Sequence, residues 1–456
     1  MLILIFSIVF ILSVAFYSTT HALGIWLVMM ITHGLIVTYF GDIGIHLPFY
    51  VGISILAVLM VKKELRNFNY ELLILTLILL LLMVMSALAG LNQTKSIIYI
   101  SLYAKGVFLA LIIAATVVEV KNVKILSMYC LGGLVFGALV TVYQYKTGNF
   151  SIDGYYLKRA GGLRKDPNDT AMLLLSGLSI SVYWLYKIKS RLIKLVPLFS
   201  GLLLLVGIAL TNSRGGFVTL VFIGFVLYAK KPSLKNTISL VAVVVLIGLL
   251  APQTYWDRME SLVTGQEQHG GKSMSSRVEL LKRGGLIFLN NPVLGVGSGN
   301  FGSALQLTYT DDGGSASAIK SRVGSSNAAA HNMYLEFFSE NGFVTGLLFL
   351  YILFKALMNY YNFDKFRHSK GVIEIYGLGF ALSVAILAML FASMFLSQGK
   401  NSVLWFLVGI AFSAACIKRP EHTDVESDKE KLKPGTADES VTNKGDCQKY
   451  KGVTLR

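Results

Sequence analysis

Charged residues are scarce in this sequence of 456 residues, of which only 14% are Asp, Glu, Lys or Arg. Soluble domains carry about 25% of such residues, so the shortage excludes an ordinary soluble protein. Hydrophobic residues make up 54% of the chain, and the apolar runs are long enough for helices that cross a membrane. The alternating strands of an outer-membrane barrel do not fit such runs. The composition therefore predicts an all-α fold, a polytopic transmembrane helix bundle.

Cysteine is also scarce, with only Cys130, Cys416 and Cys447 in the whole chain. Their odd number and wide separation exclude a disulfide framework and show no metal-ligand spacing. Basic residues are absent before the first apolar run, MLILIFSIVFILSVAFY, and small-residue spacing after it is weak. A signal peptide normally has both features, so we expect an uncleaved first span.

Apolar segments recur along the chain and predict twelve or thirteen spans, because one of the first three crowded segments could lie in the interface. We expect four regions: helices with short loops over 1–251, a large loop over 252–332, C-terminal helices over 333–417 and a disordered tail over 418–456. The apolar segments lie near residues 2–17, 22–40, 47–61, 71–90, 97–118, 125–143, 170–186, 192–210, 215–229, 236–251, 342–358, 372–395 and 402–417.

Basic residues are clustered in five connections that all fall on one side of the membrane when the spans are counted. Positively charged loops face the cytoplasm, so this side and the tail should be cytoplasmic. The same rule accounts for the formal charge of +16, which gives no indication of nucleic-acid binding. The clusters begin at Lys62, Lys121, Lys187, Lys230 and Lys365.

Two loops on the opposite, outer face nevertheless carry basic residues, which oppose this orientation. The simplest reason for placing them there is an anionic ligand, and the alternative is that each side chain reaches to lipid phosphates. These residues are Lys146, Lys158, Arg159, Arg164 and Lys165 in the first loop, and Arg258, Arg277, Lys282, Arg283 and Arg322 in the second.

The junction from Thr211 to Gly216 joins two spans at the outer face. Asn212 or Ser213 can cap the following helix, whose first N–H groups and positive dipole end then point outward. With the guanidinium of Arg214 beside them, these groups would form an anion site suited to phosphate. The alternative is a tight turn with one interfacial arginine.

Two further helix starts carry arginines on the outer side. Asp166 followed by Pro167 is a helix start signal, and both Arg159 and Arg164 precede it. Ser276 and Glu279 have the spacing of a capping box, which would place Arg277 in the first turn of a short surface helix that stops before Pro292.

The run from Gly297 to Gly302 matches the string G-x-G-x-x-G, but no βαβ unit surrounds it. As a dinucleotide site it has little value, and we interpret it as a flexible turn. His331 lies at the end of the long loop, where the chain returns to the membrane. The unperturbed pKa of histidine suits proton transfer near neutral pH. Tyr334 and Glu336 follow, and Glu340-Asn341-Gly342 breaks the helical stretch. The alternative for His331 is a hydrogen-bonded surface residue.

Taken in order, these motifs resemble the O-antigen ligase and polymerase family, whose members are polytopic glycosyltransferases of the bacterial inner membrane. The resemblance covers roughly residues 150 to 355, while the first spans and the tail are similar only in hydropathy. It is carried by Arg159 to Asn168 with its Asp-Pro-Asn, Ser213-Arg214-Gly215, Arg277, Asn291-Pro-Val-Leu-Gly-Val-Gly-Ser-Gly-Asn-Phe301, and His331-Asn-Met-Tyr-Leu-Glu336 with Asn341-Gly342.

The resemblance implies a donor glycan on undecaprenyl pyrophosphate, a periplasmic active site, and neither a metal nor another cofactor. Arg214, Arg277 and one of Arg159 and Arg164 would neutralise the pyrophosphate, and the sequence leaves open which of these two does so. His331 would orient or deprotonate the acceptor hydroxyl. Supporting positions would be Ser213, Asn332, Tyr334 and Glu336.

The resulting hypothesis is a polymerase of O-antigen or exopolysaccharide repeats in the inner membrane, with a glycan acceptor. One alternative is a ligase that transfers the glycan to lipid A-core. A second, of another class, is a transporter or flippase of lipid-linked saccharide, which would carry ionisable residues along a path in mid-span. The spans here are nearly free of charge.

Overall fold

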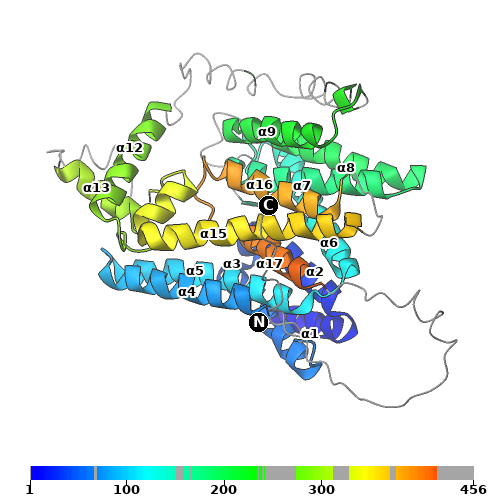
Figure 1. Ribbon diagram of the computed structural model, residues 1–456, viewed down its shortest axis with the longest axis horizontal. Coiled ribbons are helices and arrows are strands. Elements are labelled where there is room, and N and C mark those ends of the chain that lie inside the picture. Colours follow the sequence, from blue (N-terminus) through cyan, green and yellow to red (C-terminus); the bar gives the residue numbers. More distant parts are fainter. Residues whose placement is uncertain are drawn as a thin grey trace, which may run out of the picture.

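Every element in the described part of the chain is a helix, which confirms the predicted all-α class (Figure 1). The computed structural model describes residues 2–65, 69–149, 159–164, 166–234, 236–238, 241, 256, 274–311, 328–369 and 376–417. The tail over 418–456, predicted to be disordered, lies outside these residues.

Over residues 2–149, as far as the structure describes them, the chain forms six helices, and the connection between the second and third is bent by 71°. A second break follows at Gly41, whose φ of 54° is left-handed. The helices are α1 (Leu2–Tyr17), α2 (Thr19–Ile31), α3 (His33–Val61), α4 (Tyr70–Ala89), α5 (Gln93–Thr116) and α6 (Val120–Thr147).

The remaining helices begin with a short 3-10 turn, η2 (Gly162–Arg164). Two of them, α12 and α13, lie in the segment predicted as a large loop, beside the N-terminal end of α15 (Figure 1). The helices are α7 (Pro167–Lys187), α8 (Arg191–Leu210), α9 (Arg214–Lys230), α12 (Met274–Asn290), α13 (Phe301–Asp311), α15 (Met333–Ser369), α16 (Leu378–Ala392) and α17 (Ser402–Cys416).

Within the described residues, four helices are long and apolar enough to cross a membrane, namely α4, α5, α6 and the Met333–Lys365 part of α15. The bent pair of Thr19–Ile31 and His33–Gly41 would make a fifth. Shorter apolar helices cover other expected spans, and most of 236–251 lies outside the described residues. The chain is thus a multi-pass membrane protein, and the count of twelve or thirteen spans stays a prediction.

Helices α16 and α17 form the centre of the bundle. From Val403 to Ala414 every residue of α17 is buried, as expected of a helix that is apolar all round. Side-chain hydroxyls hold these helices to their neighbours: Ser179 donates to the Ala381 carbonyl (2.7 Å) and Tyr360 donates to the Leu407 carbonyl (2.7 Å). Such hydrogen bonds between helices satisfy polar groups that lipid cannot.

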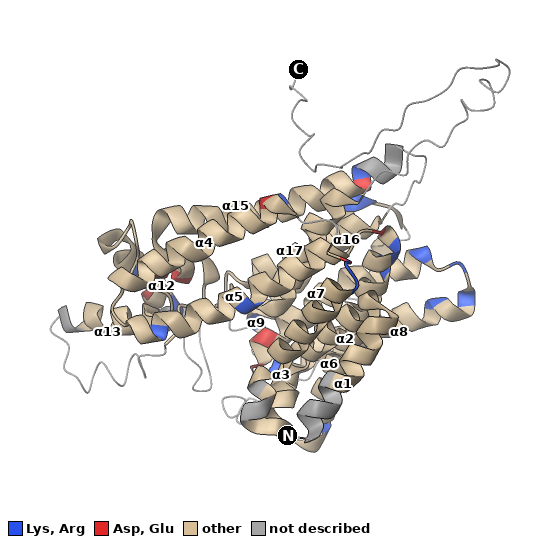
Figure 2. Cartoon of the chain, turned by 90° about the horizontal axis from the view of Figure 1, so that it is seen from below, with Lys and Arg blue, Asp and Glu red and all other residues tan. Residues whose placement is uncertain are grey.

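The helix ends form two groups, and Figure 2 shows that many of the Lys, Arg, Asp and Glu positions lie near these ends. At one end, Asn236 accepts a hydrogen bond from Tyr186 (3.1 Å) and donates one to Tyr376 (3.2 Å). These three residues follow or precede connections that carry the basic clusters. The loops counted to the opposite face, around residues 159–168 and 211–214, meet at the other end.

Helix α15 is broken at Gly342, as the sequence predicts, with φ 79° and ψ 177°. The break accommodates the glycine-rich loop, whose Gly297 N–H donates to the Glu340 carbonyl (2.8 Å). The interpretation of this loop as a flexible turn is wrong, because Ser298 and Asn300 are both fully buried, at 0% exposure. Packing between α4 and α15 encloses the loop: the Leu91 N–H donates to the Val296 carbonyl and the Ser86 hydroxyl to the Glu340 carbonyl.

Substitution of Gly342 by alanine should destabilise the folded protein. A Cβ atom there would lie 2.0 Å from the Val293 carbonyl oxygen at a left-handed φ. Strain of this kind costs roughly 1–3 kcal/mol or more. The midpoint of thermal unfolding of the detergent-solubilised protein should therefore fall. The matched control is Gly132→Ala in α6, where a Cβ meets nothing within 4 Å. An equal midpoint for both variants would contradict the expectation.

Candidate active site

A pocket opens where α7 and α9 begin and α16 ends, with an empty volume of about 400 Å³, its open mouth included. Among the described residues that line it are three of the four arginines that the resemblance offers for pyrophosphate binding, and none is acidic. The lining residues are Arg159, Asn168, Met172, Ser213, Arg214, Gly215, Gly216, Arg277, Ala392, Phe395 and Leu396. We refer to it as the arginine pocket.

Arg159 lies in the wall of this pocket and is only 8% exposed. Hydrogen bonds hold its side chain from two sides. Its Nε donates to the Thr211 carbonyl (3.2 Å) and its Nη2 donates to the Asn168 side-chain oxygen (2.9 Å). The same oxygen accepts a hydrogen bond from the Ser213 hydroxyl (2.8 Å). Asn168 therefore joins the loop before α7 to the junction before α9.

The start of α7 is built as the sequence predicts. Asp166 is the N-cap and accepts from the Asn168 N–H (2.7 Å), and Pro167 occupies the first helical position. The loop before it is held by Gln144 of α6, which accepts from the Gly162 N–H (2.8 Å) and donates to the Gly162 carbonyl (3.1 Å). These contacts fix the approach of the chain to the pocket.

Arg214 is the first residue of α9, and Ser213 is its N-cap, which confirms the capping prediction at that position. The Ser213 hydroxyl accepts from the Gly216 N–H (3.1 Å). The positive end of the α9 dipole thus points into the arginine pocket beside the guanidinium. Gly215 and Gly216 line the wall there, so the backbone itself is accessible to a ligand.

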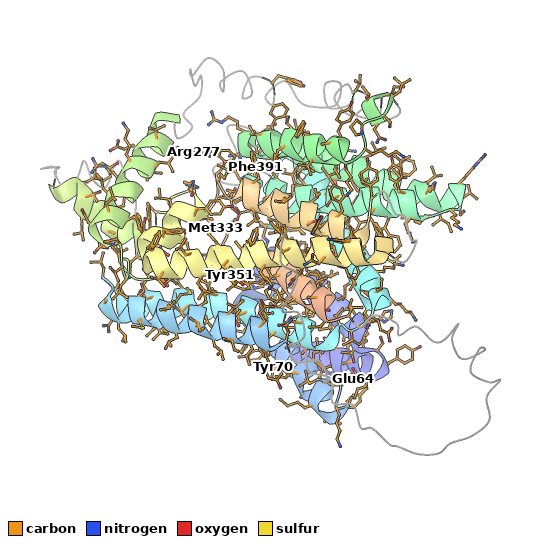
Figure 3. The ribbon with its side chains drawn as sticks, in the orientation of Figure 1. Glu64, Tyr70, Arg277, Met333, Tyr351 and Phe391 are labelled. Atoms are coloured by element: carbon orange, nitrogen blue, oxygen red, sulfur yellow. The ribbon has the colours of Figure 1, made fainter. Side chains whose placement is uncertain are left out.

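Arg277 reaches the pocket from α12, and Figure 3 shows it at the same end of the bundle as Phe391 and Met333. The helix stops before Pro292, as predicted, but it already begins at Met274. The predicted capping box is therefore wrong, because Ser276 lies inside the helix. Glu279 instead forms an ion pair one turn on with Arg283 (2.6 Å).

The charge distribution of the pocket favours an anion. Three guanidinium groups around one cavity repel one another, and a bound anion relieves this repulsion. Guanidinium forks match phosphate or carboxylate oxygens in bidentate fashion. The arrangement therefore has the charge and the kind of donor groups that suit a phosphate.

Arg164 is not part of this pocket. Its side chain turns away to the bend between α2 and α3, where Nη2 donates to the Met30 carbonyl (3.3 Å). Burial lowers the pKa of its guanidinium, and the charge of the nearby Asp169 opposes that shift. The structure thus separates two arginines that are five positions apart, and it brings only Arg159 together with Arg214 and Arg277.

His331 does not line the arginine pocket but lies on the turn before α15, with a left-handed φ of 51°. This turn is bonded to residues 390–397, at the end of α16, which also supply Ala392, Phe395 and Leu396 to the pocket. The Met333 N–H donates to the Ser393 carbonyl (2.9 Å). His331 and the three arginines are thus placed around one short segment.

The three supporting residues predicted after His331 all hold this turn. Asn332 is the N-cap of α15, accepting from the Leu335 N–H (2.9 Å) and donating to the Met394 carbonyl (3.1 Å). Tyr334 donates to the Leu390 carbonyl (2.8 Å). Glu336 accepts from the Ala330 N–H (2.8 Å) and from the Ser397 hydroxyl.

Sequence reasoning missed Asn168 and the wall formed by Phe395 and Leu396. Asn168 contributes to the family resemblance through its Asp-Pro-Asn motif, but the sequence assigns it no role of its own, and the preceding Asp166 and Pro167 indicate only a helix start. Phe395 and Leu396 follow an apolar span directly, and no feature of the sequence distinguishes them from it. Their role depends on the packing of α16 against α7 and α9.

The fold and this site define a multi-pass helical membrane protein with an arginine-lined pocket at one end of its bundle. Residues 199–350 match the family described as O-antigen ligase. This match supports the O-antigen ligase and polymerase family and confirms the resemblance of the motifs that lie within it, while the motif from Arg159 to Asn168 precedes the matched residues. It includes Arg214, Arg277 and the His331 turn, and no curated protein matches the chain.

Replacement of Glu336 by alanine should loosen the His331 turn. The change leaves the Ala330 N–H and the Ser397 hydroxyl without their acceptor, at a cost of about 1–3 kcal/mol per buried group. Hydrogen exchange of the amides at 328–333 should then be about tenfold faster or more. Glu336→Gln keeps one acceptor oxygen and should retain most of the protection. Unchanged exchange in Glu336→Ala would show that other contacts hold the turn.

Proposed function

We propose that the protein transfers saccharide from undecaprenyl pyrophosphate onto a hydroxyl of an acceptor glycan. The family match supports glycan chemistry of the O-antigen ligase and polymerase type. The observation that carries the finer proposal is that Arg159, Arg214 and Arg277 line one pocket. His331 lies on a turn bonded to the segment that completes the pocket wall.

In this proposal the arginine pocket binds the pyrophosphate of the donor. Hydrogen bonds hold the guanidinium of Arg159, Arg214 adds a second guanidinium at the start of α9, and the first N–H groups of α9 add the positive end of a helix. Phe395, Leu396 and Met172 supply an apolar wall beside them. A prenyl chain can then remain in hydrocarbon while the glycan extends into water.

The reaction exchanges one glycosidic bond for another. The acceptor oxygen attacks the anomeric carbon with inversion, and the bond from that carbon to the phosphate oxygen breaks. His331 takes the hydroxyl proton, and the departing lipid pyrophosphate keeps the electron pair. General-base assistance contributes about 10²–10⁴ in rate, and arginines that neutralise the leaving group contribute through electrostatic stabilisation.

The proposed location is the bacterial inner membrane, with the active site on the periplasmic face and the C-terminus in the cytoplasm. It is supported by the basic clusters that begin at Lys187, Lys230 and Lys365, whose connections meet at the end of the bundle opposite the arginine pocket. The segment over 252–332, which contains α12 and α13, would then be the periplasmic loop that carries Arg277 and His331.

Polymerisation of repeats and ligation to lipid A-core share the donor and the base and differ in the acceptor. We favour the polymerase, and the description of the matching family as O-antigen ligase favours the alternative. Surface glycans of a deletion strain separate the two: chains of a single repeat identify a polymerase, and long unattached chains identify a ligase.

The His331→Ala variant tests the proposed base in that deletion strain. It should insert into the membrane at the normal amount, because His331 lies on a turn that its neighbours hold through other groups. It should leave the glycans of the deletion strain unchanged. His46→Ala, an exposed position in α3, is the control that should restore the wild-type glycans. Wild-type glycans from His331→Ala would exclude it as the base.

Arginine substitutions test the pyrophosphate site. Loss of a charge-assisted contact costs about 1.5–3 kcal/mol, so Arg159→Lys and Arg214→Lys should lower transfer about ten- to a hundredfold. The alanine variants should lower it further, because lysine keeps the charge and loses only the fork.

Arg164→Lys is the matched control, because that side chain lies outside the pocket and lysine can still donate to the Met30 carbonyl. Its transfer, normalised to the amount of protein in the membrane, should stay near wild type. Wild-type transfer by both Arg214→Lys and Arg214→Ala would end the role of Arg214.

A further inference from the structure

Asn168 lies in the wall of the arginine pocket, and the orientation of its amide is fixed. Its side-chain oxygen is 2.9 Å from Nη2 of Arg159 and 2.8 Å from Oγ of Ser213. A guanidinium group donates hydrogen bonds and cannot accept them, so the atom that faces Arg159 must be the oxygen. Both lone pairs of that oxygen are used, and the NH₂ group lies on the other branch of the amide.

The backbone of Asn168 is also fixed. It is the second residue of α7, and its N–H donates to the Asp166 side chain at 2.7 Å. The side chain is therefore held before any ligand arrives, and little conformational entropy is lost on binding. The NH₂ group has no hydrogen-bond partner among the described residues, while the residue itself lines the pocket.

We propose that Asn168 is a ligand-binding residue of this pocket, whose NH₂ group donates to a phosphoryl oxygen while its carbonyl oxygen positions Arg159 and Ser213. The inference rests on the proposed pyrophosphate site. The Asn168 amide adds a neutral, directional donor to the charges of the arginines, so it orders the phosphoryl group as well as attracting it.

The chemistry of the position explains why an amide suits it. An aspartate would have the same shape and would hold Arg159 and Ser213 at least as well, because its carboxylate accepts both hydrogen bonds. It would, however, present an oxygen where the amide presents a donor. Replacement by Asp therefore keeps the contacts within the protein and removes only the donor to the ligand.

The test uses the full chain in detergent micelles with geranylgeranyl pyrophosphate as the probe, and it compares Asn168→Asp and Asn168→Ala with the wild type. Both variants should bind the probe at least about tenfold more weakly, since one charge-assisted hydrogen bond contributes that much or more. Asn92→Asp is the matched control: it is the N-cap of α5, and it adds the same charge outside the pocket. It should bind as the wild type does.

The salt concentration distinguishes two causes of weaker binding by Asn168→Asp, namely the loss of a hydrogen bond and the repulsion by the added charge. The measurement is made at about 0.1 M and about 1 M salt, between which the screening length falls from about 10 Å to about 3 Å. A loss of affinity that is caused by a missing hydrogen bond persists at both salt concentrations. Wild-type affinity of Asn168→Asp, or a deficit that disappears at high salt, would overturn the proposal and leave Asn168 as a residue that only positions its neighbours.

Failure of the inference differs from failure of the proposed function. If the wild type binds the probe and Arg214→Ala does not, the pyrophosphate site stands whatever Asn168→Asp does. If the wild type itself does not bind the probe, the pyrophosphate site is refuted, and the proposal for Asn168 is refuted with it.

Discussion

The arrangement of this protein depends on the requirement that backbone polar groups at helix ends find partners within the protein. In a bilayer an unsatisfied N–H or carbonyl group costs several kcal/mol. The first turns of α7, α9 and α15 meet this requirement with the side chains of Asp166, Ser213 and Asn332. All three helices begin at the same end of the bundle. Because these capped helix starts lie together, the positive dipole ends of three helices also lie in one region.

The arginine pocket follows from this convergence. Arg159 precedes α7 and Arg214 opens α9, so each guanidinium is attached to a helix start that is already fixed. Asn168 joins the two through one oxygen atom. A cluster of positive charge in a membrane protein is costly unless water or an anion reaches it, and the open mouth of the pocket allows both. Charge and accessibility therefore point to the same class of ligand.

Local signals in the sequence were sufficient for the starts of α7 and α9 but not for that of α12, and they could not show which arginines share the pocket. Asp166-Pro167 and Ser213 act within one turn, so residue type alone predicts them. Arg159 and Arg164 stand in one loop with similar surroundings in sequence. Their separation depends on contacts with the Thr211 and Met30 carbonyls, which are 52 and 134 positions away. Signals that act over a short stretch of sequence made the fold class predictable. The choice between Arg159 and Arg164 depends on contacts between distant segments, so the sequence alone could not predict it.

The glycine-rich loop is a second case in which local sequence was not sufficient, because its residue types predicted a flexible turn and the structure shows a buried loop. Its Gly, Ser and Asn residues are typical of a turn, yet α4 and α15 enclose it, and the break at Gly342 accepts its backbone. The segment from Met333 to Gly342 is thereby anchored at both ends, to residues 390–394 at the first and to this loop at the second. A histidine on the turn before such a segment keeps its position relative to the arginine pocket. The arginine pocket and the proposed base then lie at one end of the bundle, on segments that are joined by hydrogen bonds.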